Sequence, residues 1–196
     1  LAAMLNEGTK NRTPEELEEE IELLGAMIRV SADDEDITVS VNTLARNFEK
    51  TLALVEEMLL EPRWDSAAFE LVRTRTLNGL RRSSIDPTYL GSMALNKLIL
   101  GEENIYSTDV SGTPESVKAM TMEQLKAFYE KNFSPSVTRF LVVGDVEQAR
   151  VEKALSSLDT RWSPKEVQIP QIAPVPVPEK PAVYFVNIPD AKQSNI

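Results

Sequence analysis

The apolar pattern changes its period at Gly25, and this change limits the folds open to the chain. Before Gly25, Thr13 followed by proline, with Glu16 three residues on, predicts a capped helix start. The helix has an apolar stripe at helical spacing, formed by Leu17, Ile21 and Leu24. From Ala26 to Thr43 apolar and polar residues alternate instead, which predicts a β-hairpin with one apolar face. A helix followed by an antiparallel hairpin indicates an α+β protein.

The remaining predicted elements fit the same class. Further helices are predicted at residues 48–59, 65–86, 88–100, 121–131 and 147–158. Residues 102–116 are predicted to form a loop, and the valine-rich run Thr138–Val143 a short strand. We therefore expect a mixed or antiparallel sheet with helices packed on one face.

Residues 164–181 predict a domain boundary because they hold six of the twelve prolines. The first domain is then residues 1–163, and residues 182–196 begin a following domain with a new strand at Ala182–Ile188. A polyproline ligand for a partner domain is the alternative interpretation of the linker. Because the first residues form an apolar helical run without the pattern of a signal peptide, we expect the chain to be part of a longer protein.

The composition excludes several kinds of chemistry. The sequence contains no cysteine and no histidine, so thiol nucleophiles, Cys/His zinc sites and Ser-His-Asp triads are impossible within it. A net charge of −10 argues against nucleic acid as a partner. No run of apolar residues is long enough for a membrane span.

Three charge clusters have both a functional and a structural interpretation. The acidic residues between Glu15 and Glu22 could bind a cation or a basic partner, but a solvated helix face is favoured. Residues 33–36 are all acidic, yet they lack the spacing and glycine of a calcium loop, so a polar hairpin turn is favoured. Four arginines on one predicted helix could bind an anion, although surface salt bridges are favoured: Arg73, Arg75, Arg81 and Arg82.

Short motifs along the whole chain resemble the insulinase/pitrilysin family of zinc peptidases, whose active members carry H-x-x-E-H. These motifs are Leu1–Thr9, Leu23–Ala26, Leu60–Trp64, Gly112–Val117, Asn132–Pro135 and Val142–Val146. The resemblance implies one domain of the insulinase-like fold. Residues 190–194 resemble the first strand of the next domain.

The departures from the family pattern concern its zinc site. Alignment on Met4 puts Ala3 where the second zinc-binding histidine would stand and Ala2 where the catalytic glutamate would stand. The third ligand of the family, a glutamate, has its counterpart near Gly79. None of these side chains offers a ligand atom, so the sequence predicts no catalytic residue and no metal site.

The resemblance implies a noncatalytic half that encloses and positions a peptide for a homologous catalytic half, which would hold the zinc in the same chain or in another subunit. The family also suggests a bacterial periplasm or cell envelope. A purely structural or assembly subunit derived from the family is the second hypothesis. A third is an enzyme that uses two close carboxyl groups, one of them with a strongly raised pKa.

Overall fold

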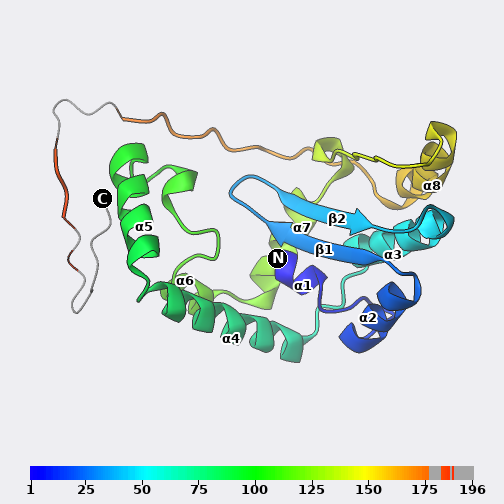
Figure 1. The fold of residues 1–196 in the computed structure, drawn as a ribbon, viewed down its shortest axis with the longest axis horizontal. Helices are drawn as coiled ribbons and strands as arrows, with labels where there is room; N and C mark the ends of the chain where they lie inside the picture. The colour runs from blue at the N-terminus through cyan, green and yellow to red at the C-terminus, as the bar shows by residue number, and fades with distance from the viewer. Residues whose placement is uncertain (177–181, 186, 188–196) are drawn as a thin grey trace. The chain divides into compact units, whose positions relative to one another are not determined.

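The computed structural model describes residues 1–176, 182–185 and 187, and the chain divides into two compact units. The first unit comprises residues 1–72 and 121–169, and the second comprises residues 73–120 and the described residues from 170 onward. The helices and strands of each unit are labelled in Figure 1. The predicted boundaries at residues 163 and 181 stay predictions. Residues 177–181, 186 and 188–196, which include the motif at 190–194, lie outside the described residues.

The predicted helix start at Thr13 is confirmed. Helix α2, Pro14–Leu23, begins with a capping box: the backbone N–H of Glu16 donates to Thr13 Oγ1 at 3.2 Å, and the N–H of Thr13 donates to Glu16 Oε2 at 2.8 Å. After the helix, Gly25 has φ +57°, a left-handed conformation that glycine adopts without strain. The chain can therefore reverse directly into the first strand.

The predicted hairpin is also confirmed. Strands β1, Met27–Ala32, and β2, Ile37–Asn42, pair antiparallel, with Val30 opposite Val39. In the turn between them, Asp33 Oδ1 accepts hydrogen bonds from the N–H groups of Glu35 at 3.0 Å and Asp36 at 2.8 Å. The acidic residues 33–36 thus form the polar turn. Together with the helices, this antiparallel pair confirms the α+β class.

The main core of the first unit lies between the hairpin and three helices: α1 (Ala2–Leu5), α2 and α3 (Phe48–Leu60). Its buried members are Ala2, Leu5, Leu17, Ile21, Leu24, Val30, Leu54, Val55, Met58 and Leu59. The stripe predicted on α2 belongs to this set. Burial of these side chains is the main stabilising contribution within the first unit.

A second, smaller cluster joins α1 to α4 (Ser66–Ser83) and α7 (Met122–Asn132) through Met4, Phe69 and Leu125. Beside it, four aromatic rings form a row: Trp64, Tyr129, Phe133 and Trp162, with successive centroids 5.5, 4.9 and 5.1 Å apart. Trp162 follows α8 (Gln148–Arg161), so the row links residues from distant parts of the sequence.

The second unit contains α5 (Pro87–Leu100), η2 (Ile105–Ser107) and α6 (Pro114–Ala119). The expectation of a loop through residue 116 is wrong, because Thr113 caps α6 and the helix starts at Pro114. Asn104 is buried; its side chain accepts from the N–H of Tyr106 and donates to the carbonyl of Ala173 at 2.9 Å. This bond holds part of the proline-rich segment within the second unit.

Two predicted strands are absent from the described residues. Thr138–Val143 forms no strand, because no described segment of the chain pairs with it through backbone hydrogen bonds. Within Ala182–Ile188, the described residues 182–185 and 187 have no regular structure, and the others lie outside the description. No helix among the described residues is long and apolar enough to cross a membrane.

Candidate functional site

The positions that the family resemblance points to carry no ligand atoms. Ala2 and Ala3 are consecutive residues of α1; Ala2 is buried and Ala3 is exposed. Gly79 lies on α4 in the part of that helix belonging to the second unit, and a Cβ at Gly79 would meet nothing within 4 Å. These residues do not fit a zinc ion, which needs nitrogen, sulfur or oxygen ligands. Their assignment as degenerate site positions stays a prediction.

Among the described residues, no group of three or more Asp, Glu, His or Cys side chains is arranged to hold a metal ion. Helix α1 is instead held by an amide. Asn6 Nδ2 donates to the carbonyls of Ala2 and Val30, each at 3.0 Å, and Asn6 Oδ1 accepts from the N–H of Val30 at 3.2 Å. The end of α1 is therefore fixed to β1 by a side chain that the sequence did not single out.

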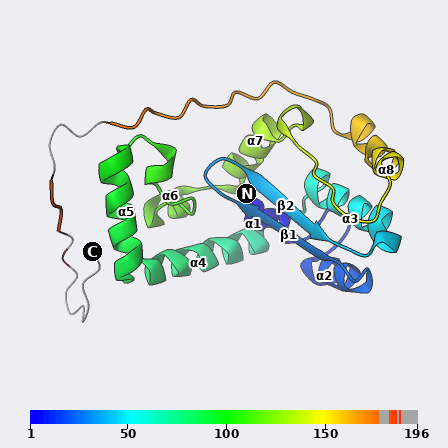
Figure 2. The ribbon, with the colours of Figure 1, turned by 45° about the horizontal axis from the view of Figure 1, so that its top comes forward.

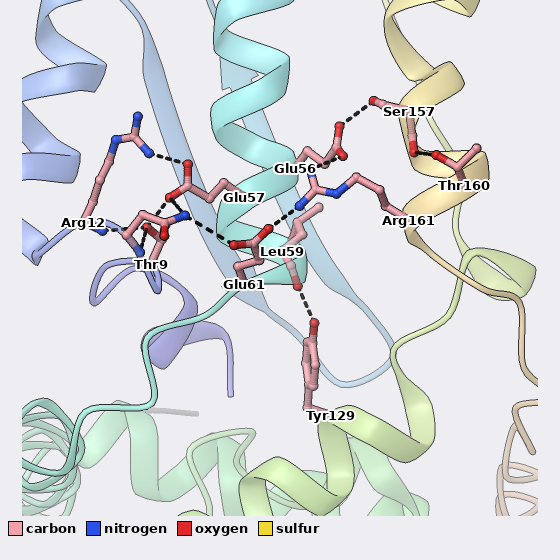
Figure 3. A network of polar contacts seen from close by, with 11 residues as sticks. Thr9, Arg12, Glu56, Glu57, Leu59, Glu61, Tyr129, Ser157, Thr160 and Arg161 are labelled. Atoms are coloured by element: carbon pink, nitrogen blue, oxygen red, sulfur yellow. Dashed lines mark hydrogen bonds and ion pairs between the residues drawn. The ribbon is translucent and has the colours of Figure 1, made fainter.

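Helix α3 carries the densest polar network of the first unit (Figure 3). On one side, Glu57 accepts a 2.5 Å hydrogen bond from the hydroxyl of Thr9 and forms an ion pair with Arg12. The Thr9 side chain is fully buried. The same hydroxyl accepts from the N–H of Arg12 at 3.0 Å, which closes the loop after α1 onto α3.

On the other side of α3, the network reaches α8 (Figure 3). Arg161 donates to Glu56 at 2.6 Å and pairs with Glu61. The second oxygen of Glu56 accepts from the hydroxyl of Ser157 at 2.6 Å. Because Glu56 is only 4% exposed, these partners supply the hydrogen bonds that water would otherwise provide.

The protonation of the network favours a structural role. Burial pushes the pKa of Glu57 upward, but the hydrogen bonds from Thr9 and Arg12 and the charge of Arg12 outweigh it, so that pKa is lowered. Each carboxyl group of the described chain with a shifted pKa is shifted downward: Glu16, Asp33, Glu49, Glu57, Asp109 and Glu123. A general acid at neutral pH needs a raised pKa, so these groups do not supply one.

An apolar groove lies on the opposite side of β2 from β1. Its volume is about 390 Å³, and its walls are β2, α3 and residues 138–146, with Phe133 and Trp162 at one end. Figure 2 shows residues 138–146, between η3 (Pro135–Val137) and α8, passing beside β2. The sequence signal for this groove is the valine-rich run Thr138–Val143, whose pattern predicts only a strand.

The α+β fold of the chain is that of a metallopeptidase domain, because the solved structures that it resembles are M16 peptidase domains. Two family models match the chain. One described as Insulinase (Peptidase family M16) covers residues 1–87, and one described as Peptidase M16 inactive domain covers residues 119–196. Both models describe the M16 family of peptidases, so the matches support an insulinase-family noncatalytic half.

Individual relatives agree with this assignment. An uncharacterized zinc protease of Mycobacterium leprae is 28% identical over 148 residues, which are 75% of this chain and 33% of that protein. The structure of a peptidase M16 inactive domain from Pseudomonas fluorescens is 25% identical, with a TM-score of 0.79 over 88% of this chain and 42% of that chain.

The periplasmic protease PqqL of Escherichia coli shares the fold, with 18% identity and a TM-score of 0.74 over 89% of this chain and 20% of that chain. The chain therefore spans only a fifth to less than half of the length of these relatives. The resemblance to the insulinase family and its α+β fold is confirmed.

Proposed function

We propose that the chain is the noncatalytic domain of an M16 zinc peptidase and helps to enclose and position a peptide for a catalytic half. The strongest support is the match to the M16 inactive domain. The chain has alanines, Ala2 and Ala3, as the first two residues of α1. Without ligand atoms there, zinc chemistry has to be supplied by a homologous half that carries H-x-x-E-H.

The proposed partner is that catalytic half, joined in the same polypeptide or as a separate subunit. The lengths of the relatives support such a partner. This chain matches 33%, 42% and 20% of three of them, so each relative contains more polypeptide outside the matched part than inside it. The proposed location is the bacterial periplasm or cell envelope, which the periplasmic relative from Escherichia coli supports.

The test is to purify the natural assembly and compare it with the catalytic half alone. We expect one zinc per assembly, removed together with proteolysis by a chelator, and no zinc in the 196-residue chain alone. A quenched fluorescent peptide should be cleaved with a lower KM when both halves are present, because two halves enclose the peptide. Stoichiometric zinc in the isolated chain with chelator-sensitive cleavage would overturn the proposal.

A purely structural or assembly role is the second candidate, favoured by the paired carboxylates around α3, which leave no free acid–base group in that network. The same experiment separates the two. If the catalytic half alone cleaves the peptide with unchanged KM and kcat but dissociates or aggregates, this chain acts in assembly. Cross-linking of a photoreactive peptide to this chain would instead support substrate positioning.

A further inference from the structure

The side chain of Asn6 occupies the outer edge of strand β1. Its Nδ2 donates to the carbonyl of Val30 at 3.0 Å, and its Oδ1 accepts from the N–H of Val30 at 3.2 Å. Figure 1 shows α1, which Asn6 follows, on the side of β1 away from β2. One side-chain amide therefore makes with Val30 the same two bonds that a neighbouring antiparallel strand would make.

These two bonds identify the backbone groups of β1 that point outward. In an antiparallel pair, alternate residues bond to the partner strand, and the residues between them point away from it. Since both backbone groups of Val30 bond to Asn6, those of Ile28 and Ala32 point outward as well. Among the described residues, β1 pairs only with β2, and no further hydrogen bond reaches these outward groups. The outer edge of β1 is therefore an unpaired strand edge with one closed position at its centre.

The sequence of β1 supplies few of the other features that protect a strand edge. The strand Met27–Ala32 contains one charged residue, Arg29, and no proline. A two-fold pairing with β1 of a second copy, centred on Val30, would place Arg29 opposite Ser31 of that copy, so no like charges would face each other. The two copies would exchange the N–H and C=O groups of Val30, which are the groups that Asn6 binds.

We propose that Asn6 is an edge-blocking residue: its amide saturates the centre of the β1 edge and keeps it from pairing with β1 of a second copy of the chain. The same Nδ2 donates to the carbonyl of Ala2 at 3.0 Å, which holds the amide in the orientation that Val30 requires. Asn6 itself is exposed, so it can be changed without a cavity in the core. The inference concerns the chain by itself and does not depend on the proposed function.

Hydrogen exchange of the Val30 amide tests the block. In the natural chain this N–H should exchange slowly at every protein concentration. In dilute Asn6→Ala it should exchange at least about 10-fold faster because its acceptor is gone, and it should become slow again as the concentration rises and copies pair. A Val30 amide that stays slow in dilute Asn6→Ala, or that regains no protection in concentrated Asn6→Ala, would overturn the inference.

Sedimentation velocity measures the pairing itself, in about 0.3 M NaCl to screen the repulsion between copies that each carry a net charge of −10. Over an about 100-fold range of concentration, the natural chain should stay monomeric and Asn6→Ala should dimerise, with a dissociation constant at least about 10-fold lower. The control, Asn11→Ala, removes an exposed amide that binds Glu57 and Glu61 instead of β1, and should stay monomeric. A natural chain that dimerises through β1, or a monomeric Asn6→Ala, would contradict the proposal.

A second substitution separates edge pairing from a loosened α1. If Asn6 served only to hold α1, Asn6→Ala would associate through the loosened helix, and changes on β1 would not matter. Ala32→Pro removes the outward N–H of an exposed residue at the end of β1, and its bonds to β2 stay in place. Added to Asn6→Ala, it should restore the monomer, and an unchanged dimer would exclude pairing through β1. If Asn6→Ala does not fold, Asn6→Gln, whose amide lies one methylene further out, should dimerise in the same way but more weakly.

Discussion

Helix α3 has two apolar faces, and one of them is covered only in part: on the groove side Val55 and Leu59 are buried, whereas Phe48 and Leu52 are not. Leu54 and Met58 are 4% and 2% exposed, because α1, α2 and β1 pack over them. Phe48 and Leu52, on the same helix, are half-buried and line the groove instead. The residue types are the same on both faces. Burial in this protein is therefore determined by the presence of a second layer, and composition alone does not reveal which face has one.

The covered face also has polar contacts at its borders. Glu57 binds the loop after α1, and Glu56 binds α8, so two segments that are distant in sequence are fixed to α3. Within the part of the chain that the structure describes, residues 138–146 form no hydrogen bond to β2, and Thr138 donates to the carbonyl of Ser134 instead. We expect the covered face to determine the stability of the first unit and the groove to contribute little in this chain.

The largest difference between the two faces is expected from a pair of identical substitutions on α3. Leu54→Ala should lower the free energy of unfolding by about 2–5 kcal/mol, because it leaves a cavity in the main core. Leu52→Ala removes the same atoms at a half-buried site and should lower it by about 1 kcal/mol or less. The two variants have the same helix propensity, so urea unfolding compares burial alone. Equal effects would show that the two faces are equally packed.

A smaller loss is expected at the contact between α3 and α8. Arg161→Met leaves the buried carboxylate of Glu56 without its cation and should lower the free energy of unfolding by about 1–3 kcal/mol. The control is Arg82→Met on the exposed surface of α4, which should change it by about 0.5 kcal/mol at most. When Glu56→Gln is added to Arg161→Met, the double variant should regain part of the lost free energy of unfolding, because no buried charge is then left unpaired. If the double variant regains nothing, Arg161 and Glu56 do not interact energetically.

The sequence predicted the elements whose signals are local. Thr13 and Thr121 each precede a residue that completes a capping box three positions later, and both helices begin as predicted. The hairpin was predicted because its alternation and its turn lie within one stretch of chain. The polar network was missed, since Glu57 and Arg12 are 45 residues apart and Glu56 and Arg161 are 105 apart.

The prediction for Thr138–Val143 was wrong for a related reason. Its valine-rich pattern indicates a strand, but a strand also requires a hydrogen-bonded neighbour, and a local pattern cannot show whether that neighbour is present. The candidate site positions Ala2, Ala3 and Gly79 came from the family resemblance alone. Periodicity and composition say only that these side chains cannot bind zinc, not that related proteins bind it there.

A further loss is expected at the row of aromatic rings. Tyr129 donates to the carbonyl of Leu59 at 2.6 Å, and Tyr129→Phe keeps the ring while removing this bond, which should lower the free energy of unfolding by about 0.5–1.5 kcal/mol. Burial raises the pKa of Tyr129 from 10.0 to about 12. The folded state therefore favours the neutral phenol, and this contribution is lost as the pH rises from 10 to about 12.

The alkaline measurement separates this effect from the lost bond. Thermal unfolding measured between pH 10 and 12 should show a smaller decline of stability for Tyr129→Phe than for the natural chain. Tyr89→Phe is the comparison in the second unit, because a hydrogen bond to Asp109 raises the pKa of Tyr89 to about 12 as well. An unchanged alkaline decline in Tyr129→Phe would mean that its hydroxyl reaches solvent in the folded protein.

An acid-side effect is expected for Glu57. Its lowered pKa means that the folded state favours the carboxylate, so its contribution is present above the unfolded value of 4.5 and is lost as the pH falls through the lower folded value. Glu57→Gln should therefore show a shallower loss of stability below pH 4.5 than the natural chain.

The smallest effect is expected in the uncovered groove, and it decides whether the two faces of α3 really differ. Leu141→Thr introduces a β-branched, strand-compatible residue and removes a large apolar side chain that is 91% exposed. In the 196-residue chain it should change the free energy of unfolding by about 0.5 kcal/mol at most, since no packing is lost. A loss comparable to that of Leu54→Ala would require Leu141 to be buried in solution. The groove would then already be filled within this chain, and the contrast between the two faces would be lost.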